Sequence, residues 1–183
     1  TINADTFLDP ITFQMGGVSG DITTSGALVT ANLAMTFTAG TGNSGVFTQG
    51  DGSSTIATGS GAITVNADTI ALSETANTVT TTGAITLQPN TAGRPIVIGD
   101  AGAATDLALS TAEIAALTDA ASGITIGKAN SGAVTISAIT FNDPITILGA
   151  AMTVTALEAA ANNITLTSTS TIDELADNTT TDI

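Results

Sequence analysis

Residues 94–154 read RPIVIGDAGAATDLALSTAEIAALTDAASGITIGKANSGAVTISAITFNDPITILGAAMTV, and this stretch decides the predicted fold. Short runs that carry Ile, Val or Leu at every second position recur in it. The runs are Ile96–Ile98, Leu107–Leu109, Ile124–Ile126, Val134–Ile136 and Ile145–Ile147. Their first residues lie 11, 17, 10 and 11 positions apart. This spacing predicts a series of short β-strands separated by turns.

The step of 17 residues contains a helix signal. Ser110 can cap the start of a helix, and Glu113 can bond back to it, so that the pair forms a capping box. The same spacing recurs near the C-terminus, in Thr155–Glu158 and in Thr171–Glu174. We therefore expect a short helical excursion at each of these places, within an otherwise regular run of strands.

Three motifs in the same stretch belong together. Leu-Ser-x-x-Glu-Ile spans residues 109–114, Gly-Ile-Thr-Ile-Gly spans 123–127, and Ser-Gly-x-Val-Thr-Ile-Ser spans 131–137. They resemble the strand-repeat regions of filamentous-haemagglutinin-like adhesins, which are very large bacterial surface proteins, and the resemblance covers about a third of the chain. It implies a right-handed parallel β-helix that is secreted and works as a fibre or adhesin, with no active site to transfer.

Composition favours the same fold independently. The 183 residues have the length of one domain, and 43% of them are hydrophobic. Most of these side chains are small or β-branched, and the chain has five Phe but no Trp or Tyr. Such residues build a thin, repetitive core of the kind found in stacked coils. We therefore expect one β-solenoid-type domain over residues 1–183, either a whole subunit or a segment of a longer repeat protein.

One sequence pattern is repeated far along the chain. Ile-x-Ala-x-Thr-Phe-x-Asp-Pro-Ile-Thr occurs over residues 2–12 and again over 136–146, at a constant offset of 134. In each copy the Asp-Pro pair predicts a turn that starts a strand, because Pro fixes φ and lacks a donor. The two copies would lie near opposite ends of a solenoid, where head-to-tail pairing could use them. The candidate assembly residues are Phe7, Asp9, Pro10, Phe141, Asp143 and Pro144.

A shorter repeat indicates the size of one coil. Gly-Ala-Ile-Thr occurs at residues 61–64 and 22 residues later at 83–86, which predicts about 22 residues and two or three strands per coil. About eight such coils would make a rod of roughly 40 Å. The alternative fold is a β-sandwich, because short strands every 8–12 residues also describe that class. It would polymerise by strand donation, with residues 1–13 entering the groove of the next subunit.

The charge of the chain excludes several partners. Sixteen acids stand against Arg94 and Lys128, for a formal net charge of −14. Such a chain repels nucleic acid and anionic membranes, so we expect neither as a partner. No apolar run reaches 18 residues, so we also expect no membrane insertion.

Side chains that carry chemistry are scarce. The chain has no His, Cys or Tyr, which removes the usual general bases and nucleophiles, and we expect no enzyme and no cofactor. Arg94 and Lys128 fit solvated surface charges better than a substrate site. Asp100 and Asp106 flank a Gly/Ala-rich turn and are weak Ca²⁺ candidates. A turn Asp that bonds its own backbone explains them more simply.

A structural role remains. The two ends of a solenoid present unpaired backbone groups that further coils can cover. We expect a subunit or segment of an extracellular, cell-surface bacterial filament or adhesin. It would assemble head to tail with itself, and a host or matrix surface would be a further partner.

The alternative function is an ice- or surface-binding solenoid with threonine arrays. It is suggested by Thr-x-Thr pairs at residues 36/38, 78/80, 153/155 and 165/167. Residues two apart on a strand face the same way, so stacked pairs would make a flat threonine surface. The pairs do not recur at one fixed position of the predicted coil, however, and Thr suits any exposed strand face.

Overall fold

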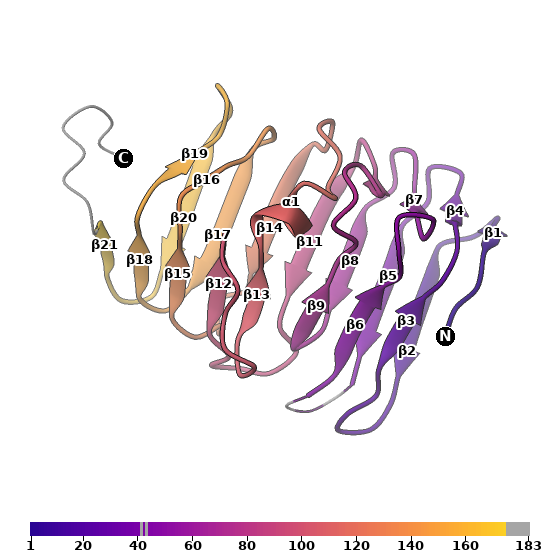
Figure 1. The fold of residues 1–183 in the computed structure, drawn as a ribbon, viewed down its shortest axis with the longest axis horizontal. Helices are drawn as coiled ribbons and strands as arrows, with labels where there is room; N and C mark the ends of the chain where they lie inside the picture. The colour runs from indigo at the N-terminus through magenta and orange to yellow at the C-terminus, as the bar shows by residue number, and fades with distance from the viewer. Residues whose placement is uncertain (41, 43, 175–183) are drawn as a thin grey trace.

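The computed structural model describes residues 1–40, 42 and 44–174. Over these residues the chain lays short strands into stacked sheets, from β1 at one end to β21 at the other (Figure 1). Every strand pairing in this part of the chain is parallel. The predicted all-β, parallel solenoid-type arrangement is therefore confirmed. The β-sandwich alternative is wrong, because a sandwich pairs antiparallel strands.

One sheet, here called the long sheet, runs through all the described coils. Its strands are, in spatial order, β2 (Ile11–Met15), β5 (Met35–Ala39), β8 (Ile63–Asn66), β11 (Ala84–Gln88), β14 (Gly123–Gly127), β17 (Ile145–Gly149) and β20 (Ile164–Ser168). Every second side chain of β5 and β17 is buried. Ile63, Ile85 and Ile124 stack directly on one another, so β-branched apolar side chains line the interior of the coils.

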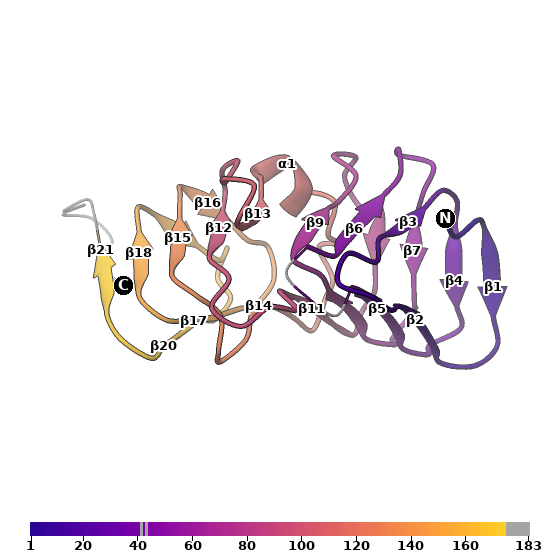
Figure 2. The same ribbon diagram turned by 90° about the horizontal axis from the view of Figure 1, so that it is seen from below.

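A second face follows the long sheet in each coil. Its strands are, in spatial order, β3 (Ile22–Thr24), β6 (Val46–Gln49), β9 (Thr69–Ala71), β13 (Leu107–Leu109), β12 (Ile96–Ile98), β15 (Val134–Ile136), β18 (Met152–Val154) and β21 (Ile172–Glu174). The spatial order departs from the chain order at one place, because β13 lies between β9 and β12 (Figure 2). A single coil therefore contributes two strands to this face.

A third face completes the coils. Its strands are β1 (Asp5–Phe7), β4 (Leu28–Thr30), β7 (Ile56–Ala57) and β10 (Val79–Thr80) in one sheet, and β16 (Ile139–Thr140) and β19 (Leu157–Glu158) in another. Between the two groups, helix α1 (Thr111–Ile114) and the segment after it take the place of a strand. Leu117 forms a bridge with Val79, and the Thr118 N–H donates to the Val79 carbonyl at 2.9 Å.

The coils differ in length, so the prediction of a uniform 22-residue coil is wrong. Ile85 and Ile124 stack although they are 39 positions apart, whereas Ile145 and Ile164 stack at a separation of 19. The long coil holds the extra strand β13, the loop before it and α1. Surface turns absorb such insertions, while the inward apolar positions keep their register. The long sheet accordingly has seven strands where about eight coils were expected.

The capping-box prediction is confirmed once and wrong twice. The Ser110 hydroxyl accepts from the Glu113 N–H at 3.2 Å, and the Glu113 carboxylate accepts from the Ser110 N–H at 2.9 Å, at the start of α1. Thr155–Glu158 and Thr171–Glu174 instead contribute strands β19 and β21. These strands pair with β16 and β18 of the preceding coil, so stacking outweighs the local helix signal.

Candidate functional site

The first coil leaves part of the apolar interior accessible. Ile11 and Phe13 of β2 point inward but are only half-buried, and so is Phe7 of β1. The Phe13 ring stacks on Phe37 with centroids 5.2 Å apart, while Phe7 meets the edge of Phe13 at 5.5 Å. A small hollow of about 170 Å³ lies next to Phe13, between β2 and β3. The interior is thus covered on one side only at this end.

The last described coil also has an accessible interior. A hollow of about 430 Å³ is lined by Val154, Ile164, Leu166, Ile172 and Glu174, which come from β18, β20 and β21. Val154 is buried, whereas Ile172 is 47% exposed. Apolar side chains that would be buried within a stack of coils are therefore accessible at both ends of the described chain.

The strands at the two ends have compatible patterns. β2 begins Ile-Thr-Phe and β20 begins Ile-Thr-Leu, and in both the threonine lies on the outer side. The Ile11 N–H donates to the Ala34 carbonyl at 3.1 Å, on the side of β5. Because neighbouring residues of a parallel strand bond to opposite sides, the Thr12 N–H lies on the outer edge of β2. Within the described residues no strand pairs with that edge or with the outer edge of β20.

The two Asp-Pro copies occupy the same corner of different coils. Residues 7–10 precede β2, and residues 141–144 precede β17. Phe7 is half-buried in the first coil, and Asp9 and Pro10 are exposed. Phe141 and Asp143 are only 1% and 6% exposed, because β19 and β20 lie beyond them. The first copy is therefore at an end of the described coils and the second lies one coil inside.

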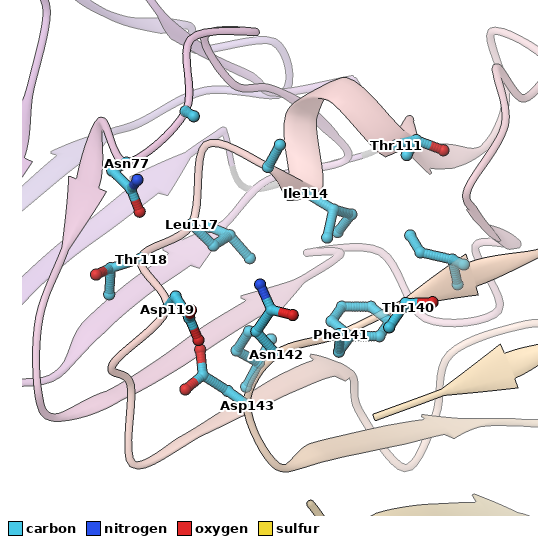
Figure 3. A pocket seen from close by; sticks show the side chains of 14 residues that line it. Asn77, Thr111, Ile114, Leu117, Thr118, Asp119, Thr140, Phe141, Asn142 and Asp143 are labelled. Carbon is cyan, nitrogen blue, oxygen red and sulfur yellow. The ribbon is translucent and has the colours of Figure 1, made fainter. Parts of the chain in front are cut away.

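The second copy lines a pocket of about 330 Å³ at the break in the third face. Ile114, Leu117 and Phe141 form an apolar floor, and Figure 3 shows the carboxylates of Asp119 and Asp143 directed toward each other at its margin. Asp143 is among the candidate residues predicted from the sequence. Its neighbour Asp119 was not predicted, because 24 positions separate the two and only the coil winding brings them together.

The Asp143 carboxyl is in an unfavourable place for a charge. Burial, and then repulsion by Asp119, raise its pKa above the ordinary value, although a hydrogen bond from the Ala121 N–H opposes the change. The folded state therefore holds this proton more tightly than the unfolded state. Stability from this group is greatest below the ordinary pKa of 3.8 and is lost as the pH rises through the higher folded-state pKa.

Asp143→Asn should stabilise the protein at neutral pH, because it removes a buried charge while its amide oxygen can still accept from Ala121. We expect the melting temperature at pH 7 to rise by about 2–4 °C, and the gain to vanish near pH 3. Melting curves between these pH values test this. Asp119→Asn, which removes only the repulsion, should give a smaller gain; a loss of stability in Asp143→Asn would contradict the proposed penalty.

The weak calcium candidates bond to their own turns. The Asp100 carboxylate accepts from the Ala101 N–H at 2.7 Å, and the Asp106 carboxylate accepts from the Ala103 N–H at 2.8 Å. No group of three or more potential metal-ligating side chains occurs in the part of the chain that the structure describes. The two carboxylates thus serve to fix the loop between β12 and β13.

The two cations also hold corners together. Arg94 donates through Nη2 to the carbonyls of Ala104 and Asp106, each at 3.2 Å, and so fastens the same loop. Lys128 donates through Nζ to the Asn90 carbonyl at 2.8 Å. Both side chains are half-buried and bind backbone oxygens, which is a structural use of positive charge.

Threonines form a continuous column on the long sheet. The Thr-x-Thr pairs lie on three different faces, as expected, but one threonine of every long-sheet strand occupies the same register. This threonine column consists of Thr12, Thr36, Thr64, Thr86, Thr125, Thr146 and Thr165. Unequal coil lengths hide this regularity in the sequence.

Comparisons with known proteins give no relative. No model of a known protein family matches the chain, and neither the curated proteins nor the solved structures contain a match to it. Among the described residues, no helix has the length and apolar character needed to span a membrane. The functional conclusions below therefore rest on the geometry of the chain itself.

Proposed function

We propose that this chain is a rod-like structural segment of an extracellular bacterial filament or adhesin, in which further coils stack on its two ends. The observation that carries the proposal is the match between β2 and β20: stacked in register, Ile11 would lie on Ile164 and Thr12 on Thr165. The further coils can come from the same chain or from another copy. The resemblance to filamentous-haemagglutinin-like adhesins supports the same role.

Burial supplies the driving force for stacking. Phe13 and Leu166 would cover each other, and each inward apolar side chain that leaves water contributes roughly 1.5–3 kcal/mol. The outer edges of β2 and β20 would exchange backbone hydrogen bonds, as parallel neighbours do inside the sheet. These are the same interactions that already join successive coils.

Charge opposes stacking and makes it depend on salt. Asp5, Asp9 and Asp21 are exposed near the first coil, and Asp173 and Glu174 are exposed in the last. Salt should therefore promote stacking, because exposed charges are screened within about 10 Å at 0.1 M ionic strength. Divalent cations such as Ca²⁺ would act in the same direction by bridging carboxylates.

Thr12→Pro should block stacking without disturbing the core. Proline removes the N–H on the outer edge of β2, whereas the Ile11 N–H that bonds toward β5 stays. We expect wild-type protein to form rods that lengthen with concentration and salt, seen by light scattering and electron microscopy, and Thr12→Pro to stay short.

Thr12→Ala is the matched control, since it changes the same side chain but keeps the N–H. It should form rods like the wild type, and melting curves should show all three proteins folded. Wild-type protein that stays a single segment at high concentration and salt would overturn the proposal for separate copies, and rods from Thr12→Pro would refute the role of this edge.

A further inference from the structure

The outer face of the long sheet differs from the rest of the surface because it carries no charge. Three positions of each strand face outward: the threonine column, the positions two residues before it and those two residues after it. Not one of these positions in the described sheet holds Asp, Glu, Lys or Arg, although the whole chain carries a net charge of −14. Depletion of charge is the compositional mark of the centre of a protein interface.

The same face has a ridge and a groove side by side. The threonine column forms the ridge, and five of its seven members are half-buried by their neighbours. The positions before it on the four strands β5, β8, β11 and β14 are Ala34, Ala62, Ala84 and Gly123. Side chains this small leave a shallow groove that runs parallel to the ridge.

Hydrogen bonds on the other flank of the ridge keep the face rigid. The Asn66 amide donates to the Thr38 hydroxyl at 3.1 Å, and the Gln88 amide donates to the Asn66 side-chain oxygen at 2.6 Å. Threonine itself is stiff at χ1 because it is β-branched. A partner therefore meets a preformed surface and loses little entropy in ordering it.

We propose that this face binds the same face of a second copy, in a two-fold pair that lays each threonine ridge in the alanine–glycine groove of the other. A second copy has the same repeat of about 4.8 Å between strands, so that ridge and groove stay in register along the sheet. Identical side chains at this repeat interdigitate in the dry interfaces of stacked sheets. A two-fold axis also makes one patch complementary to itself.

Area and charge both fit a weak but specific pair. Seven strands of five residues cover about 34 by 17 Å, so that two copies would bury about 1,100 Å² in total, just above the roughly 1,000 Å² that a specific interface needs. Pairing through this face also keeps the acidic corners of two strongly negative chains away from the contact. Further coils of a longer rod would add area in proportion.

Sedimentation equilibrium of the purified protein tests this pairing independently of end stacking, if it is carried out in the Thr12→Pro background as well as in the wild type. We expect the mass of Thr12→Pro to approach that of a dimer between micromolar and millimolar concentration. The dimer should strengthen with salt, because the interface contains no ion pair and only the surrounding repulsion is screened.

Two substitutions at the centre of the face should break the pair. Thr86 and Thr125 are neighbours in the column, and Thr86→Asp with Thr125→Asp places like charges against each other, which should weaken dimerisation at least about tenfold. The matched control is Thr135→Asp with Thr153→Asp, two outward neighbours of the second face, which should dimerise like the parent. Ala84→Gln adds no charge but fills the groove at an exposed position, and should also weaken the pair.

Other results would overturn the proposal. One is a protein that stays monomeric at millimolar concentration in high salt. Another is equal weakening by the control substitutions, since that would trace the effect to net charge alone. A monomer that inhibits ice recrystallisation, and loses this property only with the Thr86 and Thr125 substitutions, would identify ice as the occupant of the face instead of a second copy.

Discussion

Phe37→Ala should lower the free energy of unfolding by about 3–5 kcal/mol, the range for removing a fully buried aromatic ring. Phe37 is 0% exposed in β5, with its ring between Phe13, at 5.2 Å, and Phe47, at 4.9 Å. No large side chain of another layer can refill the space, because each coil supplies only a few inward residues. Urea unfolding followed by circular dichroism measures the loss.

The change in Phe37→Ala should be concentrated in the first coils. Each coil of a stacked fold contacts mainly its neighbours, so hydrogen exchange should rise in β2, β5 and β6 before it rises in β17 or β18. Thr36→Ala is the control, because Thr36 is the adjacent outward residue of the same strand, and it should change stability by less than about 1 kcal/mol. An equal loss in the two variants would mean that the aromatic stack does not anchor this end.

The parallel arrangement could be predicted because inward side chains repeat. Runs such as Ile124–Ile126 and Ile145–Ile147 appear in the sequence with the alternation of half-buried strands, and they pair in register in the structure. The Ser110–Glu113 cap was equally visible, since all its bonds are local. Features that depend on a few adjacent residues are therefore accessible from sequence alone.

Features that depend on how coils stack were not accessible. Thr86 and Thr125 are neighbours in one column although 39 residues separate them, and the exchange of β12 and β13 changes the order of strands without a mark in the sequence. The candidate site shows the same limit. Phe7 and Phe141 belong to one repeated motif, yet only the winding places the first at an end and the second beneath another coil.

Gly127→Ala should be among the most damaging single-atom additions, because two costs coincide at this residue. Gly127 ends β14 with φ of +87°, and an added Cβ would lie 2.2 Å from the Leu148 carbonyl oxygen in the neighbouring strand. The left-handed backbone costs a side chain about 1–2 kcal/mol, and overpacking against a fixed backbone costs typically 1–3 kcal/mol more. We expect a total loss of about 3–4 kcal/mol in urea unfolding.

Gly93→Ala separates the two costs of Gly127→Ala. Gly93 has a similar φ of +74°, but nothing lies within 4 Å of its added Cβ, so this variant should lose only the backbone term of about 1–2 kcal/mol. The difference between the two variants then measures how tightly β14 and β17 are stacked. If both lose the same amount, adjacent coils have room to move apart, and the close register on which the threonine column and the end-to-end stacking both depend would not hold.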